Sequence, residues 1–165
     1  MKMKRIFNQI LKPYKTIIKE LEGNYTNIKV TIGKTFCCFC RDVEDLEINV
    51  PLLEDKMGAK AFYNKMINKL QENGIDEIYS SEILSFLHEL GHIYTYNKFN
   101  DFTYCKMATL ITKVQNVDII ANNKKLTNWL YKCYFNLALE RNADKWAINY
   151  IKKNPETVRR WEKSI

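Results

Sequence analysis

The segment 79–97 constrains the fold of this chain most, because it reads as a helix with almost no polar face. Its apolar side chains recur on every side of that helix: Ile83, Leu84, Phe86, Leu87, Leu90, Ile93 and Tyr94. A helix that is hydrophobic all round is buried, so other elements must pack around this one. The same helix carries His88, Glu89 and His92, and these polar groups need partners once they leave water.

The two histidines of this segment are the only histidines in the chain. His88 and His92 are four residues apart, so both rings project from one face of the helix. The pattern His-Glu-x-x-His is typical of a zinc site, in which two imidazoles bind the ion and the carboxylate lies near the metal-bound water. We therefore expect one Zn²⁺ per chain, with Glu89 as general base. The competing interpretation is an exposed stripe with ordinary surface histidines.

A third ligand is expected from the later segment Leu139–Ala147. Glu140 and Asp144 share one helix face, and the small residues Ala143 and Ala147 on the same side would let two helices approach closely. Glu140 would complete a His₂Glu site with a fourth position left for water. Asp144 would accept the other ring N–H of His88 or His92 and orient that ring. The alternative is an ordinary ion pair of Asp144 with Arg141.

Together the two segments resemble a known family. His88-Glu89-Leu90-Gly91-His92, followed by Glu140-x-x-Ala143-Asp144-x-Trp146-Ala147, resembles the gluzincin metallopeptidases and is most similar to the ImmA/IrrE-like family of bacteria, phages and mobile elements. The resemblance implies that His88, His92 and Glu140 are zinc ligands, that Glu89 is the general base and that Asp144 supports a ligand. It also implies a protein substrate, since members of the family are associated with cutting a partner transcriptional repressor.

The resemblance covers two short motifs and the order of the elements. The gap from His92 to Glu140 is longer than the family leads us to expect, so residues 98–125 are interpreted as an insertion. No helix-turn-helix is appended, and we expect no direct binding of nucleic acid by this chain. The predicted function is that of a zinc-dependent endopeptidase (a hydrolase) acting on a protein, with a repressor of a phage or mobile element as the expected substrate.

The expected reaction also needs a residue that stabilises the oxyanion, and the sequence offers several candidates for it. Zinc lowers the pKa of its bound water to about 7, Glu89 takes the proton, and the same carboxylate passes it to the leaving amine. The zinc and one further donor must hold the oxyanion. No third histidine exists, so the candidates are Arg141 and nearby tyrosines: Tyr94, Tyr96, Tyr131, Tyr134 and Tyr150.

The remaining periodicity predicts an α+β fold, in which a small three-stranded antiparallel sheet packs beside a mostly helical zincin-like domain. The expected helices are 3–22, 54–73, 79–97, 104–121, 125–153 and 155–163, and the expected strands lie within 27–50. Gly33-Lys34 would be a hairpin turn between the first two strands. The third strand, Leu46 to Val50, is the candidate edge for pairing with an extended substrate. We expect a single domain over 1–165, with 1–22 as its N-terminal helix.

Composition narrows the classes of protein that remain. Apolar residues make up 46% of the 165 residues and charged residues 27%, which excludes a disordered chain. No run approaches the roughly 18 apolar residues of a membrane span, and the N-terminus lacks a continuous apolar region, so a cytoplasmic protein without membrane contact is expected. The five cysteines are then free thiols. Cys37, Cys38 and Cys40 include a Cys-x-x-Cys spacing, but no second close pair completes a Cys₄ site.

Two other classes of function stay open at this stage. One is a non-catalytic protein-binding antirepressor or antitoxin-like partner, whose structural zinc would be closed by a fourth protein ligand such as Cys105 or Cys133. The other is a nucleic-acid-binding protein, because the chain carries a net charge of +7 and most of the excess lies in residues 83–165. The oligomeric state is not indicated by the sequence.

Overall fold

The structure is a computed structural model of the whole chain. It describes residues 2–21, 28–33, 36–40, 46–51, 56–95 and 135–165, together with the isolated positions 125, 129, 132 and 133. The predicted helix at 104–121, the interpreted insertion at 98–125 (apart from Lys125) and the side chains of Tyr96, Tyr131 and Tyr134 lie outside these residues. Within the described part, none of the helices is both long and apolar enough to cross a membrane.

The strands are β1 (Lys29–Gly33), β2 (Cys37–Cys40) and β3 (Leu46–Pro51), and they form one sheet in the order β1-β3-β2. β3 pairs in parallel with β1, where Val30 lies beside Ile48. On its other side it pairs antiparallel with β2, where Cys37 lies beside Asn49. Leu46, Ile48 and Val50 are buried and alternate with Glu47, Asn49 and Pro51, which are only partly buried, as a half-buried strand requires.

The predicted fold class is therefore wrong. The chain is mostly helical, and its sheet is mixed rather than antiparallel, because β1 and β3 run in the same direction. No β1–β2 hairpin forms through Gly33-Lys34, since β3 lies between those two strands. β3 carries three buried apolar residues, Leu46, Ile48 and Val50, and its central position pairs its backbone groups along both edges. Because β3 is paired on both sides, it is not an edge that a substrate could join.

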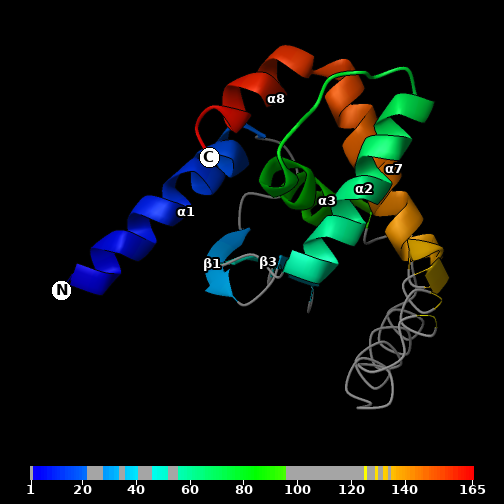
Figure 1. The fold of residues 1–165 in the computed structure, drawn as a ribbon. Helices are drawn as coiled ribbons and strands as arrows, with labels where there is room; N and C mark the ends of the chain where they lie inside the picture. Colours follow the sequence, from blue (N-terminus) through cyan, green and yellow to red (C-terminus); the bar gives the residue numbers. More distant parts are fainter. Residues whose placement is uncertain are drawn as a thin grey trace.

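The described helices are α1 (Lys2–Glu20), α2 (Lys56–Glu72), α3 (Ser81–Thr95), α7 (Ala138–Lys153) and α8 (Pro155–Glu162). α3 is at the centre of the molecule, with α2 and α7 on one side and the sheet on another (Figure 1). Its residues Ile83 to Ile93 are all buried, which confirms the expectation from its apolar surface. α2 ends at Glu72, and Gly74 in the turn that follows has a φ of 74°, a backbone conformation that glycine adopts without strain.

α7 begins later than the predicted helix at 125–153. Asn136 lies in a turn and Leu137 in a bend with φ −59° and ψ 142°, an extended conformation that precedes the first helical residue, Ala138. Pro155 then begins α8 as its first-turn residue, as predicted. α1 continues through Pro13 as one helix.

α8 packs against the C-terminal end of α1 (Figure 1). Trp161 Nε1 of α8 donates a hydrogen bond to Glu20 of α1 at 2.7 Å, and Arg160 pairs with the same carboxylate oxygen at 2.6 Å. A stack of four rings joins α8 to α7 and α3, with centroid separations of 4.8, 5.3 and 5.5 Å along the series Tyr94, Trp146, Tyr150 and Trp161. The helices around α3 are thus linked to one another by packed aromatic side chains.

Candidate metal centre

Two helices supply the polar side chains of the centre. α3 provides His88, Glu89 and His92, and α7 provides Glu140 and Asp144. All five side chains are buried, with exposed fractions from 1% for Asp144 to 8% for Glu89. α3 packs chiefly against α7, so the face of α3 that carries the histidines meets the face of α7 that carries the acids.

Gly91 and Ala143 set the close approach of these helices. A Cβ atom at position 91 would lie 2.4 Å from the carbonyl oxygen of Ala143 and 2.8 Å from its Cα, much closer than non-bonded atoms allow. Ala143 and Ala147 are fully buried at this contact, which agrees with the role expected for small residues there. The glycine within His-Glu-Leu-Gly-His therefore serves the packing that brings Glu140 to the two rings.

Three side chains converge on one point. His88 Nε2 and His92 Nε2 are 3.1 Å apart, His88 Nε2 is 3.2 Å from Glu140 Oε2, and His92 Nε2 is 3.4 Å from Glu140 Oε1. Ligand atoms held 2.0–2.2 Å from a tetrahedral ion lie roughly 3.3–3.6 Å apart, so the observed separations are close to those of three ligands of one metal. His88, His92 and Glu140 form a buried group that can hold a metal ion.

Asp144 fixes the ring of only one histidine. Its Oδ1 accepts a hydrogen bond from His88 Nδ1 at 2.9 Å, so Nδ1 carries the proton and Nε2 faces the other ligand atoms. The sequence left open which histidine Asp144 would support, and the structure assigns His88. The alternative pair of Asp144 with Arg141 does not form: Asp144 binds two lysines of α2 instead, and Arg141 is exposed.

The two lysines that hold Asp144 were not identified from the sequence. Lys65 Nζ lies 2.9 Å from Asp144 Oδ1, and Lys69 Nζ lies 2.6 Å from Asp144 Oδ2. Lysine side chains are rarely buried, yet the Lys65 side chain is only 11% exposed. The sequence did indicate that these two lysines share a face near the core. They are four residues apart, and each directly precedes a buried residue, Met66 or Leu70.

Burial and charge act in opposite directions on the ionisable groups. Burial disfavours the charged form of His88, but its contacts with Asp144 and Glu140 outweigh that effect and raise its pKa to about 9. Burial would also raise the pKa of Glu140, yet the two imidazoles hold it far below the ordinary value. The pKa of Asp144 is lowered in the same way, mainly by His88 against the effect of burial, whereas burial lowers the pKa of Lys65.

Two buried polar atoms of the centre have no hydrogen-bond partner: His92 Nδ1 and Glu140 Oε2. Glu140 Oε2 faces His88 Nε2 at 3.2 Å without the alignment of a hydrogen bond. Buried polar atoms without partners cost free energy, and a cation bound by Glu140 would satisfy its oxygen. The donor set of two imidazoles and one carboxylate is also the set that binds zinc in open sites, so these residues fit that ion.

The remaining predicted residues lie elsewhere or outside the described chain. Tyr94 lies flat against Trp146, about 200° around α3 from His92, and Tyr150 is stacked between Trp146 and Trp161. Arg141 is exposed on α7. The structure therefore does not identify an oxyanion donor among them. Of the cysteines, Cys37 is half-buried on the sheet and Cys133 is exposed.

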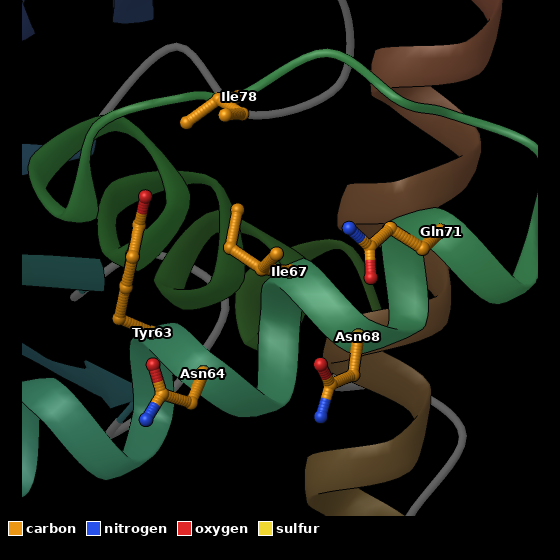
Figure 2. Close-up of a pocket in the computed structure, with 6 residues that line it drawn as sticks. All are labelled: Tyr63, Asn64, Ile67, Asn68, Gln71 and Ile78. Carbon is orange, nitrogen blue, oxygen red and sulfur yellow. The ribbon is translucent and has the colours of Figure 1, made fainter.

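A hollow of about 340 Å³ lies on a different face of α2 from the one that carries Lys65 and Lys69. Figure 2 shows five side chains of α2 around it and one side chain, Ile78, from the segment that leads to α3. The six residues are Tyr63, Asn64, Ile67, Asn68, Gln71 and Ile78. None of them belongs to the metal-binding group, so this hollow is separate from the centre.

Comparison with family models, with curated proteins and with solved structures found no match for this chain.

Proposed function

We propose that this protein is a zinc-dependent peptidase that cleaves a protein substrate. The observation that carries the proposal is the set of three separations, 3.1, 3.2 and 3.4 Å, among the facing atoms of His88, His92 and Glu140. This set supports a tripodal site for one ion. The motif on α3 adds a carboxylate, Glu89, directly beside the first ligand.

The charges in the centre support a bound cation. Glu89, Glu140 and Asp144 bring three carboxylates, and Lys65 and Lys69 bring two ammonium groups. With neutral imidazoles this leaves one unbalanced negative charge in a buried place, which is unfavourable. Against the effect of burial, contacts with Asp144 and Glu140 raise the pKa of His88, which favours a balancing proton here in the metal-free protein. A metal ion would take over that proton's role as the balancing charge.

In the proposed reaction, zinc supplies Lewis acidity, which activates water at neutral pH and polarises a peptide carbonyl. His88, His92 and Glu140 hold the ion, and Asp144 keeps the His88 ring in the orientation that presents Nε2. Glu89 accepts the proton of the attacking water and delivers it to the leaving amine. Glu89 is buried with the other side chains of the centre, at 8% exposed.

We propose a transcriptional repressor as the substrate from the resemblance of the two motifs to the ImmA/IrrE-like family. The alternative, a protein-binding partner with a closed structural zinc site, requires a fourth protein ligand. Within the described residues the metal-binding group contains three side chains, and the exposed thiol of Cys133 is not among them. Cys105 lies outside the described part. The observations therefore favour the open, catalytic arrangement.

The proposal is tested with the full chain, loaded with zinc, and an unfolded protein substrate such as casein, followed by intact mass and peptide mapping. We expect cleavage that stops on addition of a chelator and resumes with zinc. Glu89→Gln should keep the metal and lose activity by at least about 100-fold, the range in which a general base contributes. The matched control is Glu72→Gln, an exposed glutamate of α2. Retained activity in Glu89→Gln, or zinc content far below one per chain, would refute the proposal.

A further inference from the structure

We infer that Lys65 and Lys69 are positioning residues of the metal centre, which hold the carboxylate of Asp144 so that it fixes the His88 ring for metal binding. The inference rests on the proposed metal function. It adds to the centre a helix, α2, that neither the motifs nor their resemblance includes.

Each lysine binds a different oxygen of Asp144. Lys65 Nζ contacts Oδ1 at 2.9 Å, and Lys69 Nζ contacts Oδ2 at 2.6 Å. Oδ1 also accepts the hydrogen bond from His88 Nδ1 at 2.9 Å. The carboxylate is thus held at both ends, and rotation about its side-chain bonds would break at least one charge-assisted hydrogen bond.

Lys65 is enclosed rather than solvated. Its Nζ lies 4.7 Å from the centroid of the Phe62 ring and 4.4 Å from that of Phe135, and the Phe62 ring packs edge-on against His88 at 4.9 Å. A buried lysine loses the conformational freedom and hydration that make a surface ion pair weak. Lys65 therefore acts on the His88 ring through Asp144, and Phe62 contacts the same ring directly.

Asp144 needs these cations because it is 1% exposed. With His88 as its only partner, Oδ2 would be a buried carboxylate oxygen without a hydrogen bond, which costs more than an unsatisfied neutral group. The carboxylate would then turn toward any available donor or water, and the His88 ring would lose its fixed direction. Groups that orient a ligand in this way typically change metal affinity by about 10–100-fold when removed.

The sign of the effect separates positioning from simple charge. Coulomb's law alone predicts that removal of an ammonium group near a cation strengthens binding of that cation. Loss of a positioning contact weakens binding instead. A measurement of Zn²⁺ affinity by competition with a chromophoric chelator therefore distinguishes the two, with the full chain and without any use of peptidase activity.

We expect Lys69→Met to weaken Zn²⁺ binding about tenfold and Lys65→Met with Lys69→Met to weaken it by up to about 100-fold. Lys60→Met is the matched control, because Lys60 is an exposed lysine of the same helix, and it should leave the affinity unchanged. Lys69→Arg should restore most of the affinity, since arginine also donates to a carboxylate. The Co²⁺-substituted protein should show a changed visible spectrum only in the Met variants.

A double-mutant cycle tests whether the lysines act through Asp144. In an Asp144→Asn background, Lys69→Met should change the affinity less than twofold, because the contact is already lost. An equal tenfold loss in that background, or tighter binding in the single variant, would overturn the inference. Circular dichroism of the metal-free variants checks folding, and Lys69, which is 30% exposed, gives the variant least able to disturb it. Failure of the unaltered protein to bind zinc would instead refute the proposed function.

Discussion

Gly91 of α3 lies so close to Ala143 of α7 that a Cβ atom there would sit 2.4 Å from the Ala143 carbonyl oxygen. This contact lies between the elements that provide the ligands, because Gly91 precedes His92 and Ala143 precedes Asp144. The separation of the two helices thus sets the gaps of 3.2 and 3.4 Å between Glu140 and the histidines.

Gly91→Ala should therefore weaken both the fold and the metal site. Alanine favours a helix by up to about 1 kcal/mol over glycine, but the backbone clash with Ala143 forces the helices apart, at a typical cost of about 1–3 kcal/mol. We expect a net loss of unfolding free energy in urea and a weaker affinity for Zn²⁺. Stability equal to or above that of the unaltered protein would contradict the packing role of this glycine.

Glu140→Gln should abolish tight metal binding. The amide lacks the negative charge that balances the ion, so zinc should raise the melting temperature of the unaltered protein and leave that of the variant nearly unchanged. Glu72→Gln, on the exposed side of α2, serves as the control and should respond to zinc like the unaltered protein. Differential scanning fluorimetry with and without chelator measures both. A full zinc response in Glu140→Gln would remove this residue from the ligand set.

The metal-free protein should lose stability between about pH 6.5 and pH 9. Folding raises the pKa of His88 from 6.5 to about 9, so the folded state binds a proton that the unfolded state has released in this interval. That contribution is complete below pH 6.5 and is lost as pH rises through 9, at about 1.4 kcal/mol per pH unit at most. Urea unfolding in chelator measures it, and His88→Gln should flatten the slope.

Zinc affinity should change with pH in the opposite direction over the same interval. Zinc must displace the proton from His88, so its affinity should rise about tenfold per pH unit until that proton is lost. Calorimetry in buffers of different ionisation enthalpy would count the protons released. Release of none near pH 7.5 would contradict the protonated state of His88 in the metal-free protein.

Trp161→Phe should destabilise the contact between α8 and α1. The indole is 2% exposed and donates to Glu20, and hydrogen bonds to charged groups typically contribute about 1.5–3 kcal/mol. Arg160→Met removes the other donor to the same oxygen, but Arg160 is largely exposed, so its loss should cost less than about 1 kcal/mol. Chemical unfolding compares the two variants. Equal losses of unfolding free energy in the two variants would contradict the expectation that the buried contact contributes more than the exposed one.

The parts of the centre that are local in sequence were predictable. His88 and His92 share a face because they are one helical turn apart, and Glu140 and Asp144 share a face for the same reason. The lysines were not predictable in this way, because their partner Asp144 lies 79 and 75 residues further along the chain. Helical periodicity placed Lys65 and Lys69 on α2 but could not indicate which helix that face would meet.

In the sheet, too, the features that depend on nearby residues were predicted correctly, and the features that depend on distant contacts were not. Alternation of Leu46, Ile48 and Val50 with polar residues correctly indicated a half-buried strand. The order of the strands depends on contacts between distant segments, which the alternation does not reveal. The short connection through Gly33-Lys34 favoured a β1–β2 hairpin, but β3 lies between those strands. Likewise, the apolar pattern of 125–153 continued through Asn136 and Leu137, where the backbone leaves the helix before Ala138.

The stack of Tyr94, Trp146, Tyr150 and Trp161 places a fluorescent side chain, Trp146, next to the metal centre. Trp146 lies two residues after Asp144 on α7 and faces Tyr94 of α3 at 4.8 Å with almost parallel planes. Any shift of one ligand-bearing helix against the other would alter this overlap and hence the emission of Trp146. Intrinsic fluorescence, with Trp129 and Trp161 replaced by phenylalanine to isolate one emitter, would follow arrival of the ion in real time without a label.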